Sequence, residues 1–232
     1  MDSCLIFGSS KGLGRELYQL LESKGYEVKG IARSTSDTVD FECDLTNSDE
    51  VDSLYQKIRN TLPNHLIFNT GQGKSTKKDR QERKDELMRQ NLLSSTLFLD
   101  TLISEKEGLD KISTITFINS ICSLPSMKCS EEYSSAKIEL QKYADQISKD
   151  LVSRKIRVNS ILPGDVMHEN SVWNSKFDSQ SKENDYLEKN VPFGKWITPQ
   201  DIGSALEFIF SNKQLTANRL IIDGGQHLSS PN

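Results

Sequence analysis

The stretch that decides the fold is Cys4-Leu5-Ile6-Phe7-Gly8-Ser9-Ser10-Lys11-Gly12-Leu13-Gly14. Its first four residues form an apolar run, which is typical of a strand buried on both faces. Leucines at 13, 17, 20 and 21 then share one face of a helix that Gly25 ends. The glycines between strand and helix let the backbone turn tightly and approach a pyrophosphate, whose charge the first helical N–H groups meet. Because the turn lies between a strand and a helix, a dinucleotide site is favoured over a purely structural turn. The residues predicted to form this site are Gly8, Ser10, Lys11, Gly12, Leu13 and Gly14.

Strands and helices alternate along the rest of the chain. We expect strands over 27–32, 39–43, 65–69, 111–119, 156–162 and 219–222, and helices over 47–61, 83–105, 131–152 and 199–211. Such alternation with short connections is typical of βαβ units. It predicts an α/β fold with a single doubly wound (Rossmann-type), mostly parallel sheet and helices on both faces, in one domain over residues 1–232. The longer connection over 164–196 mixes aromatic and polar residues, and we expect it to cover a substrate.

The composition excludes several classes of protein. The 232 residues include 29 Lys and Arg against 33 Asp and Glu, which gives a formal charge of −4. No apolar run approaches the roughly 18 residues that span a bilayer, so we expect no membrane association. The first residues lack the basic and apolar regions of a signal peptide, which predicts a cytoplasmic protein. Acidic residues dilute the one basic cluster, over 74–84, so we expect no nucleic-acid partner.

The four cysteines are expected to be reduced. Cys4, Cys43, Cys122 and Cys129 form no Cys-x-x-Cys pair, and no histidine lies at metal-ligand spacing from them. Reduced thiols, buried or idle, are therefore favoured over a zinc site, and no metal is expected.

The end of the second predicted strand favours one dinucleotide over the other. An NAD site places an acidic residue there to bind the ribose 2′-hydroxyl, whereas this chain reads Gly-Ile-Ala-Arg over 30–33. Arg33 and Lys11 can converge on a 2′-phosphate instead, with charge-assisted hydrogen bonds. NADP(H) is therefore favoured over NAD(H). The alternative is that both cations are solvated.

A second group of residues points to proton transfer. Tyr133 and Lys137 are four residues apart in a predicted helix, so their side chains share one face, and the ammonium is expected to lower the phenol pKa from about 10. A phenol tuned in this way exchanges a proton with a carbonyl oxygen. Ser120 ends the preceding strand, and a hydroxyl at the carboxyl end of a parallel strand faces the ligand crevice of the sheet.

Together these residues resemble the classical short-chain dehydrogenase/reductases over essentially the whole chain. The resemblance rests on the Gly8 to Gly14 turn and on Asp44, Asn69, Gly71, Asn91, Ser120, Tyr133, Lys137, Pro163 and Gly164. It implies that Tyr133 is the acid/base, that Lys137 tunes Tyr133 and holds the nicotinamide ribose, that Ser120 polarises the substrate carbonyl, and that Asn91 supports a proton relay.

The resemblance also extends the set of cofactor-binding residues. Asp44, with Leu45, is expected to contact the adenine, and Asn69 and Gly71 are expected to line the cofactor; the remaining members are Arg33, Tyr133, Lys137, Pro163, Gly164 and Val166. Phe68 and Thr70 depart from the Asn-Asn-Ala-Gly stretch of the family. His168 stands where the family often keeps a Thr that contacts the nicotinamide carboxamide. The role of His168 and of the charged stretch over 72–81 stays open.

The function that the resemblance implies is hydride transfer between NADP(H) and a carbonyl or alcohol substrate. Two alternatives stay open: a catalytically silent NADP(H)-binding sensor or scaffold, and an enoyl thioester reductase on the same fold. The family commonly pairs the helices expected here over 83–105 and 131–152, so the resemblance implies a homodimer or homotetramer. The sequence does not identify the substrate.

Overall fold

The computed structural model describes residues 2–229, and its centre is one parallel sheet of seven strands in the order β3-β2-β1-β4-β5-β6-β7. Every pair of neighbouring strands is parallel; Phe7 of β1, for example, lies beside Ile31 of β2 and Phe68 of β4. The predicted Rossmann-type fold is confirmed. The strands are β1 (Ser3–Phe7), β2 (Glu27–Ala32), β3 (Phe41–Glu42), β4 (His65–Phe68), β5 (Thr114–Ile118), β6 (Arg157–Pro163) and β7 (Arg219–Ile222).

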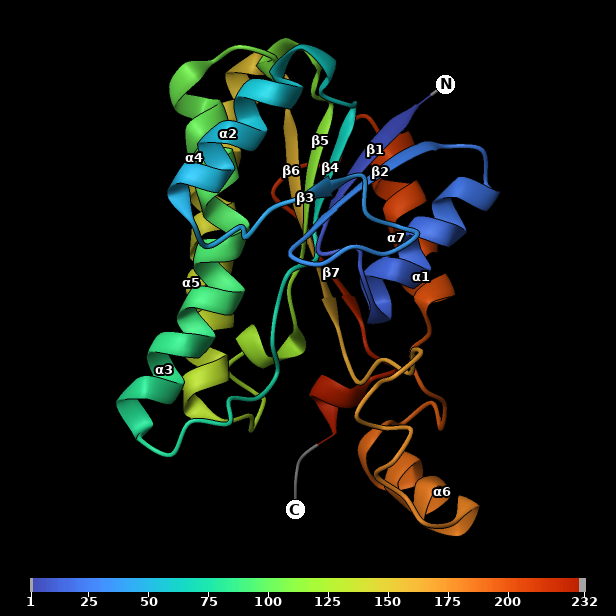
Figure 1. Cartoon of the computed structure of the whole chain (residues 1–232). Coiled ribbons are helices and arrows are strands. Elements are labelled where there is room, and N and C mark those ends of the chain that lie inside the picture. The colour runs from blue at the N-terminus through green and yellow to red at the C-terminus, as the bar shows by residue number, and fades with distance from the viewer. Residues whose placement is uncertain (1, 230–232) are drawn as a thin grey trace.

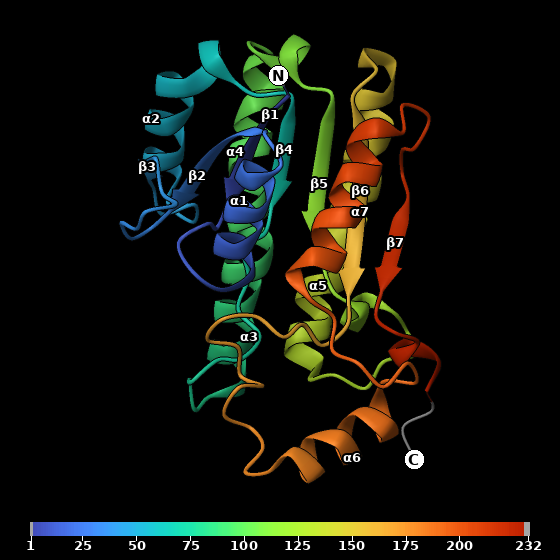
Figure 2. The same ribbon diagram turned by 90° about the vertical axis from the view of Figure 1, so that its right-hand side faces the viewer.

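Helices cover both faces of the sheet (Figures 1 and 2). On one face α1 packs beside α7, and on the other lie α2, α4 and α5. Alternate residues of each strand enter two separate cores: Leu5 and Phe7 pack beneath α2 and α4, whereas Cys4 and Ile6 pack beneath α1 and α7. The helices are α1 (Gly12–Ser23), α2 (Ser48–Ile58), α3 (Arg80–Met88), α4 (Ser94–Glu105), α5 (Glu131–Leu151), α6 (Gln180–Asn190) and α7 (Pro199–Ser211).

The helix predicted over 83–105 is interrupted. A π-helical segment, Arg89–Leu93, separates α3 from α4. A π-helical turn carries one residue more than an α-turn, so it rotates the following helix relative to the preceding one, and such turns are frequent at functional sites. Asn91 lies within this segment and is fully buried.

The segment over 164–196 contains a helix that hydrophobic periodicity did not indicate. Leu187 is the one buried residue of α6, so the apolar pattern is too sparse to mark a helix. Around α6, the rings of Trp173, Phe177, Tyr186 and Trp196 form a cluster with centroid separations of 5.2 to 6.4 Å. In Figure 2, α6 lies below the carboxyl ends of β5, β6 and β7. This is the edge at which parallel α/β sheets bind ligands.

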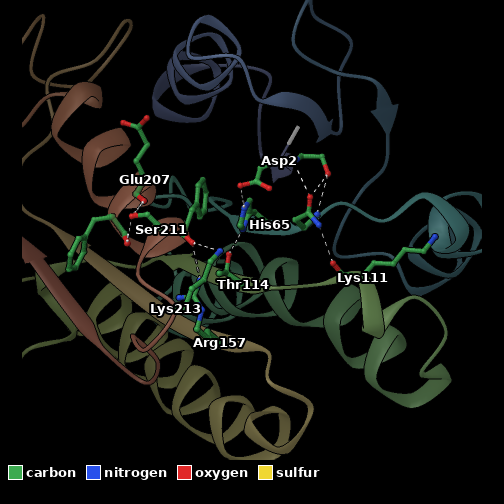
Figure 3. A network of polar contacts seen from close by, with 12 residues as sticks. Asp2, His65, Lys111, Thr114, Arg157, Glu207, Ser211 and Lys213 are labelled. Carbon is green, nitrogen blue, oxygen red and sulfur yellow. Dashed lines mark hydrogen bonds and ion pairs between the residues drawn. The ribbon is translucent and has the colours of Figure 1, made fainter.

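A buried polar network closes the opposite, amino end of the sheet (Figure 3). The His65 ring stacks on Phe210 at 3.9 Å, and its Nδ1 is 2.8 Å from the Thr114 hydroxyl. Burial lowers the pKa of His65 to about 4, although the negative charge of Asp2 acts to raise it. The ring is therefore neutral at physiological pH. Arg157 donates to the carbonyls of Leu215 and Phe210. These contacts tie β4, β5 and β6 to α7 at the end of the sheet away from the predicted site.

The prediction of four reduced cysteines is wrong for two of them. Cys122 and Cys129 form a disulfide, with their Cα atoms 5.8 Å apart, while Cys4 and Cys43 are free and buried. The chain turns sharply in the 3₁₀ turn Ile121–Ser123, after which the Leu124 N–H donates to the Ile121 carbonyl at 2.8 Å. The seven-residue separation matches no redox or metal motif, so the sequence carried no signal for this bond.

Across residues 2–229, no helix combines the length and the apolar character that crossing a membrane requires.

Candidate active site

A groove of about 590 Å³ lies at the carboxyl ends of β1, β2 and β4. In a parallel sheet the carboxyl ends of all strands lie along the same edge. The turns after β1 and β2 and the loop after β4 therefore meet there. The groove brings together most of the residues predicted to bind the cofactor: Gly8, Ser10, Lys11, Gly12, Leu13, Arg33, Asp44, Leu45, Asn69 and Gly71. Sequence reasoning missed Ser34, Thr46, Gln90 and Ser94, polar residues that also line the groove but match no motif.

The glycine turn forms a cradle that side chains would fill. Gly8 has a φ of +90°, a conformation that L side chains rarely adopt. A Cβ on Gly14 would lie 1.9 Å from the Gly8 carbonyl oxygen, so only glycine lets α1 begin this close to β1. The Asn69 amide donates to the same carbonyl at 3.0 Å and holds the turn in place. The exposed N–H groups at the start of α1 suit a pyrophosphate, and the residues therefore fit a dinucleotide.

Asp44 also lines the groove, within electrostatic reach of Arg33 and Arg89. Burial alone would raise the pKa of its carboxyl, but hydrogen bonds from the Thr46 N–H (2.9 Å) and hydroxyl (2.8 Å) and the charges of Arg33 and Arg89 hold it below its usual value. Asp44 is therefore ionised at neutral pH.

His168 lies against the glycine turn. A Cβ on Gly12 would be 3.0 Å from its Cε1, and its Nδ1 is 2.8 Å from the Glu169 carbonyl oxygen. His168 therefore lines the groove beside the glycine turn, which is the segment predicted to bind the pyrophosphate.

Helix α5 carries the two predicted catalytic residues on one face. Ser130 begins the helix and accepts from the Tyr133 N–H at 3.4 Å. One turn further on, the Lys137 amine lies 5.7 Å from the centre of the Tyr133 ring. The Tyr133 hydroxyl is hydrogen-bonded to Ser120, which stands at the end of β5 and accepts from the Cys122 N–H at 3.1 Å. The structure therefore brings Ser120, Tyr133 and Lys137 together.

The pKa values of this group differ from the expectation. Burial raises the pKa of Tyr133, and the hydrogen bond with Ser120 opposes that rise only in part. Burial also lowers the pKa of Lys137 from 10.5 to about 8. We expected Lys137 to lower the pKa of the Tyr133 phenol, and this lowering is not seen. The Lys137 amine lies 5.7 Å from the ring centre, and the effect of burial on the phenol pKa is larger than any effect of its charge. At neutral pH the phenol is protonated.

Asn91 links this group to the cofactor groove. Its amide donates to the Gln72 and Leu87 carbonyls, both at 2.9 Å, and its Oδ1 accepts from the Gln72 N–H at 3.2 Å. A Cβ on Gly71 would lie 2.8 Å from Asn91 Oδ1 and 3.4 Å from the Lys137 amine. A side chain at position 71 would therefore crowd Asn91 Oδ1, and it would reach ordinary van der Waals contact with the Lys137 amine.

Asn119, which no sequence motif singled out, fastens α5 to the end of β5. Its amide donates to the Lys137 carbonyl and to Gln141 Oε1, each at 3.2 Å. Since Asn119 directly precedes Ser120, this contact sets the distance between Ser120 and the helix that carries Tyr133. Its place at the end of a predicted strand, beside Ser120, was the available signal.

A second cavity, of about 280 Å³, opens beside Ser120. The segment over 164–196 contributes Asp165, Tyr186, Lys189 and Asn190 to its lining. Asp165 is held by the Tyr186 hydroxyl at 2.6 Å and the Gln226 amide at 2.8 Å. Gln226 and Ser229 come from the end of the chain, which carried no motif for this role.

Several predicted cofactor residues lie outside the groove lining. Gly14 packs against Gly8 and Asn69, Pro163 pairs with Ile222 in the sheet, and Val166 bridges to Ile197. Gly164 lines the second cavity instead, where a Cβ would lie 2.6 Å from Gln226 Oε1. Pro163, Gly164 and Val166 therefore lie where β6 passes into the segment over 164–196.

A doubly wound parallel sheet with a glycine turn and a Ser, Tyr and Lys group at its carboxyl edge is the arrangement expected of a nucleotide-dependent oxidoreductase of the Rossmann type. Residues 17–227 match the family model described as enoyl-(acyl carrier protein) reductase. The chain belongs to the short-chain dehydrogenase/reductase family and is an oxidoreductase.

Individual relatives span the whole chain. A human 3-oxoacyl-[acyl-carrier-protein] reductase is 27% identical and covers 97% of this chain and 98% of its own. An NADPH-bound short-chain oxidoreductase from Pseudomonas aeruginosa, described as having an atypical catalytic centre, superposes with a TM-score of 0.82 at 19% identity, covering 97% and 96% of the two chains. A 4-hydroxyisoleucine dehydrogenase complexed with NADH has a TM-score of 0.80 at 21% identity, covering 97% and 98%.

Replacing Lys137 with Met should stabilise the fold. Because the folded-state pKa is about 8 against 10.5 for the free side chain, holding the charged amine at pH 7 costs up to about 3 kcal/mol. This cost disappears as the pH rises from 8 to above 10.5, where the amine is neutral in both states. Urea unfolding should therefore show Lys137→Met to be more stable than wild type at pH 7, with the difference shrinking toward pH 10.5.

The matched control is Lys142→Met, since Lys142 is on the same helix and its side chain is 66% exposed. It should change the unfolding free energy by less than about 0.5 kcal/mol. A Lys137→Met variant that is less stable than wild type at pH 7 would show that neighbouring groups stabilise the charged amine.

Proposed function

We propose that the protein is an NADP(H)-dependent oxidoreductase that interconverts a carbonyl and an alcohol, with Tyr133 as the acid/base. One observation carries the proposal: Ser120, Tyr133 and Lys137 form a continuous group between the two cavities. Ser120 lines the second cavity and is hydrogen-bonded to Tyr133, while the Lys137 amine lies against Gly71, which lines the groove. A substrate in the second cavity and a dinucleotide in the groove would therefore meet at Tyr133.

The chain's own residues supply proton transfer and orientation. When bound, the nicotinamide supplies or accepts the hydride. The Ser120 hydroxyl would donate to the substrate oxygen, and the Tyr133 phenol would deliver its proton to the same oxygen during reduction. Because the pKa of Tyr133 is not lowered, the phenol is protonated at neutral pH and has a proton to deliver. The Lys137 ammonium would stabilise the phenolate that remains, and Asn91 would hold Gln72 and Gly71 beside Lys137.

The groove supports NADP(H) over NAD(H). Arg33 and Ser34 line it beyond the end of β2, and Lys11 lines it from the glycine turn, so two cations and a hydroxyl are available to a 2′-phosphate. No carboxylate stands at the end of β2 to bind a ribose 2′-hydroxyl. The NADPH-bound Pseudomonas neighbour agrees with this choice, whereas the neighbour bound to NADH shows that the fold accepts either.

Enoyl thioester reduction is the second candidate, favoured by the description of the matching family model. Ser120 at the end of β5 and the four-residue spacing of Tyr133 and Lys137 favour the carbonyl reaction. We also propose that the protein is cytoplasmic, that its partner is a small carbonyl or alcohol substrate, and that it forms a homodimer or homotetramer through α4 and α5.

Replacing Tyr133 with Phe tests the acid/base assignment. NADPH oxidation should be measured across aldehydes, ketones, keto-sugars and 3-oxoacyl and enoyl thioesters. For the carbonyl substrate that the wild type uses best, Tyr133→Phe should lower kcat by about 10² to 10⁴, because general acid catalysis is lost. Tyr26→Phe is the control, since Tyr26 packs on Phe210 in the other core and should leave kcat unchanged. Wild-type turnover by Tyr133→Phe, or turnover of enoyl thioesters alone, would contradict the proposal.

Replacing Arg33 with Ala tests the cofactor preference. Removing one charge-assisted contact to the 2′-phosphate should raise the Kd for NADPH by about 10- to 100-fold and change that for NADH less than twofold. Both constants are measurable by titrating the nucleotide fluorescence. The exposed Arg154, in the short 3₁₀ helix that follows the carboxyl end of α5, gives the control variant Arg154→Ala. An equal loss of affinity for both nucleotides would show that Arg33 does not contact the 2′-phosphate.

A further inference from the structure

The disulfide lies within the segment that separates two of the proposed catalytic residues. Ser120 precedes the loop over 121–130, and Tyr133 follows it in the first turn of α5. Cys122 and Cys129 sit near the two ends of this loop and join them covalently. Any change in the bond therefore acts on the chain that connects Ser120 with Tyr133.

Both cysteines also line the second cavity. Together with Met127 and Lys128 they form one part of its wall, while Asp165, Tyr186 and Gln226 belong to the covering segment and the chain end. Cys122 and Cys129 are each partly exposed, so a thiol in solution has access to the bond. The bond is thus part of the surface that a substrate in this cavity would touch.

The two ends of the loop are held by hydrogen bonds as well as by the disulfide. Ser120 Oγ accepts from the Cys122 N–H, and the Ser123 hydroxyl donates to the Ser120 carbonyl at 2.7 Å. Ser130 caps α5 through the Tyr133 N–H. The middle of the loop is held by short-range bonds, from the Leu124 N–H to the Ile121 carbonyl and from the Met127 N–H to the Leu124 carbonyl. The disulfide ties Cys129 back to the turn beside Ser120.

We propose that the Cys122–Cys129 pair is a thiol–disulfide exchange site whose oxidation state sets the affinity of the neighbouring cavity for its substrate. The proposal rests on the proposed function, in that this cavity is taken as the substrate site. Disulfides of proteins in reducing compartments are usually transient and redox-sensing, and the chain is proposed to be cytoplasmic. The bond therefore suits regulation better than permanent cross-linking.

The exchange balances with an external dithiol as reductant. A thiolate of the dithiol attacks one sulfur of the pair, the Cys122–Cys129 bond breaks, and a mixed disulfide forms. The second thiol of the reductant then displaces the protein sulfur. Two cysteine thiols and an oxidised dithiol result, and two electrons have passed to the protein. Glutathione disulfide reverses the reaction by re-forming the bond and releasing two glutathione thiols.

The other two cysteines should not interfere. Cys4 and Cys43 are buried, and burial raises the pKa of each thiol to about 12, so neither is a thiolate at neutral pH. Exchange should therefore be confined to Cys122 and Cys129.

Reduction should loosen the cavity wall and leave the catalytic group in place. We expect reduced protein to have a substrate KM about 3- to 10-fold higher than oxidised protein, because the loop over 124–129 loses its cross-link. The kcat should change less than twofold, since Ser120 and Tyr133 keep their own hydrogen bonds. The Kd for NADPH should not change, because the groove is lined by other segments.

The experiment equilibrates the full-length protein in glutathione or dithiothreitol buffers of graded potential. Thiols are counted by alkylation and mass spectrometry, kinetics are measured on the same samples, and hydrogen exchange reports the protection of amides in the loop. As the buffer becomes more oxidising and two thiols are lost to alkylation, the KM should fall and the protection of the loop amides should rise. Cys122→Ser/Cys129→Ser should show the kinetics of the reduced form in every buffer, and Cys4→Ala should respond as wild type does.

Each remaining outcome separates the two proposals. Four free thiols after treatment with glutathione disulfide, or a KM that stays constant while two thiols titrate, would overturn the redox proposal and leave the oxidoreductase proposal standing. Absence of turnover with every carbonyl in both redox states would overturn the proposed function. In that case loop protection that follows the thiol titration would still support the exchange site, and unchanged protection would overturn it.

Discussion

The buried amine of Lys137 is the group on which the rest of the site depends. It is nearly inaccessible to solvent, and burial lowers its pKa to about 8, so the fold holds a charge there at a cost. The surrounding contacts determine where that amine lies: Asn119 fastens the Lys137 backbone to the end of β5, and Gly71, where a side chain would crowd Asn91 Oδ1, lies beside the amine. A position this costly is expected where chemistry requires it.

The sheet explains why the parts of the site converge. All seven strands are parallel, so the glycine turn after β1, Arg33 after β2, Gly71 after β4 and Ser120 after β5 come to the same edge. The amino edge carries the neutral His65 and its hydrogen bonds instead, which serve packing. Chemistry and stability are therefore divided between the two ends of the same strands.

Much of this could be predicted from the sequence, because short apolar runs, glycine turns and helical spacing are local signals. The glycine turn, the ends of β1 and β5 and the pairing of Tyr133 with Lys137 were predictable in this way. The rest depends on distant parts of the chain meeting. Gln226 reaches Asp165 from the chain end, Cys122 meets Cys129 through a loop without a motif, and α6 has too few apolar residues to mark a helix. The direction of the Tyr133 pKa shift depends on desolvation, which spacing alone does not report.

In the proposed reaction a hydride passes between a nucleotide in the groove and a carbonyl carbon held beside Ser120 and Tyr133. The most direct test is a reaction with NADPH carrying deuterium at C4 of the nicotinamide, followed by mass spectrometry of the alcohol product. If the proposed reaction takes place, deuterium will appear on the former carbonyl carbon. Alcohol product whose carbonyl carbon carries solvent hydrogen, when each face of C4 has been labelled in turn, would contradict it.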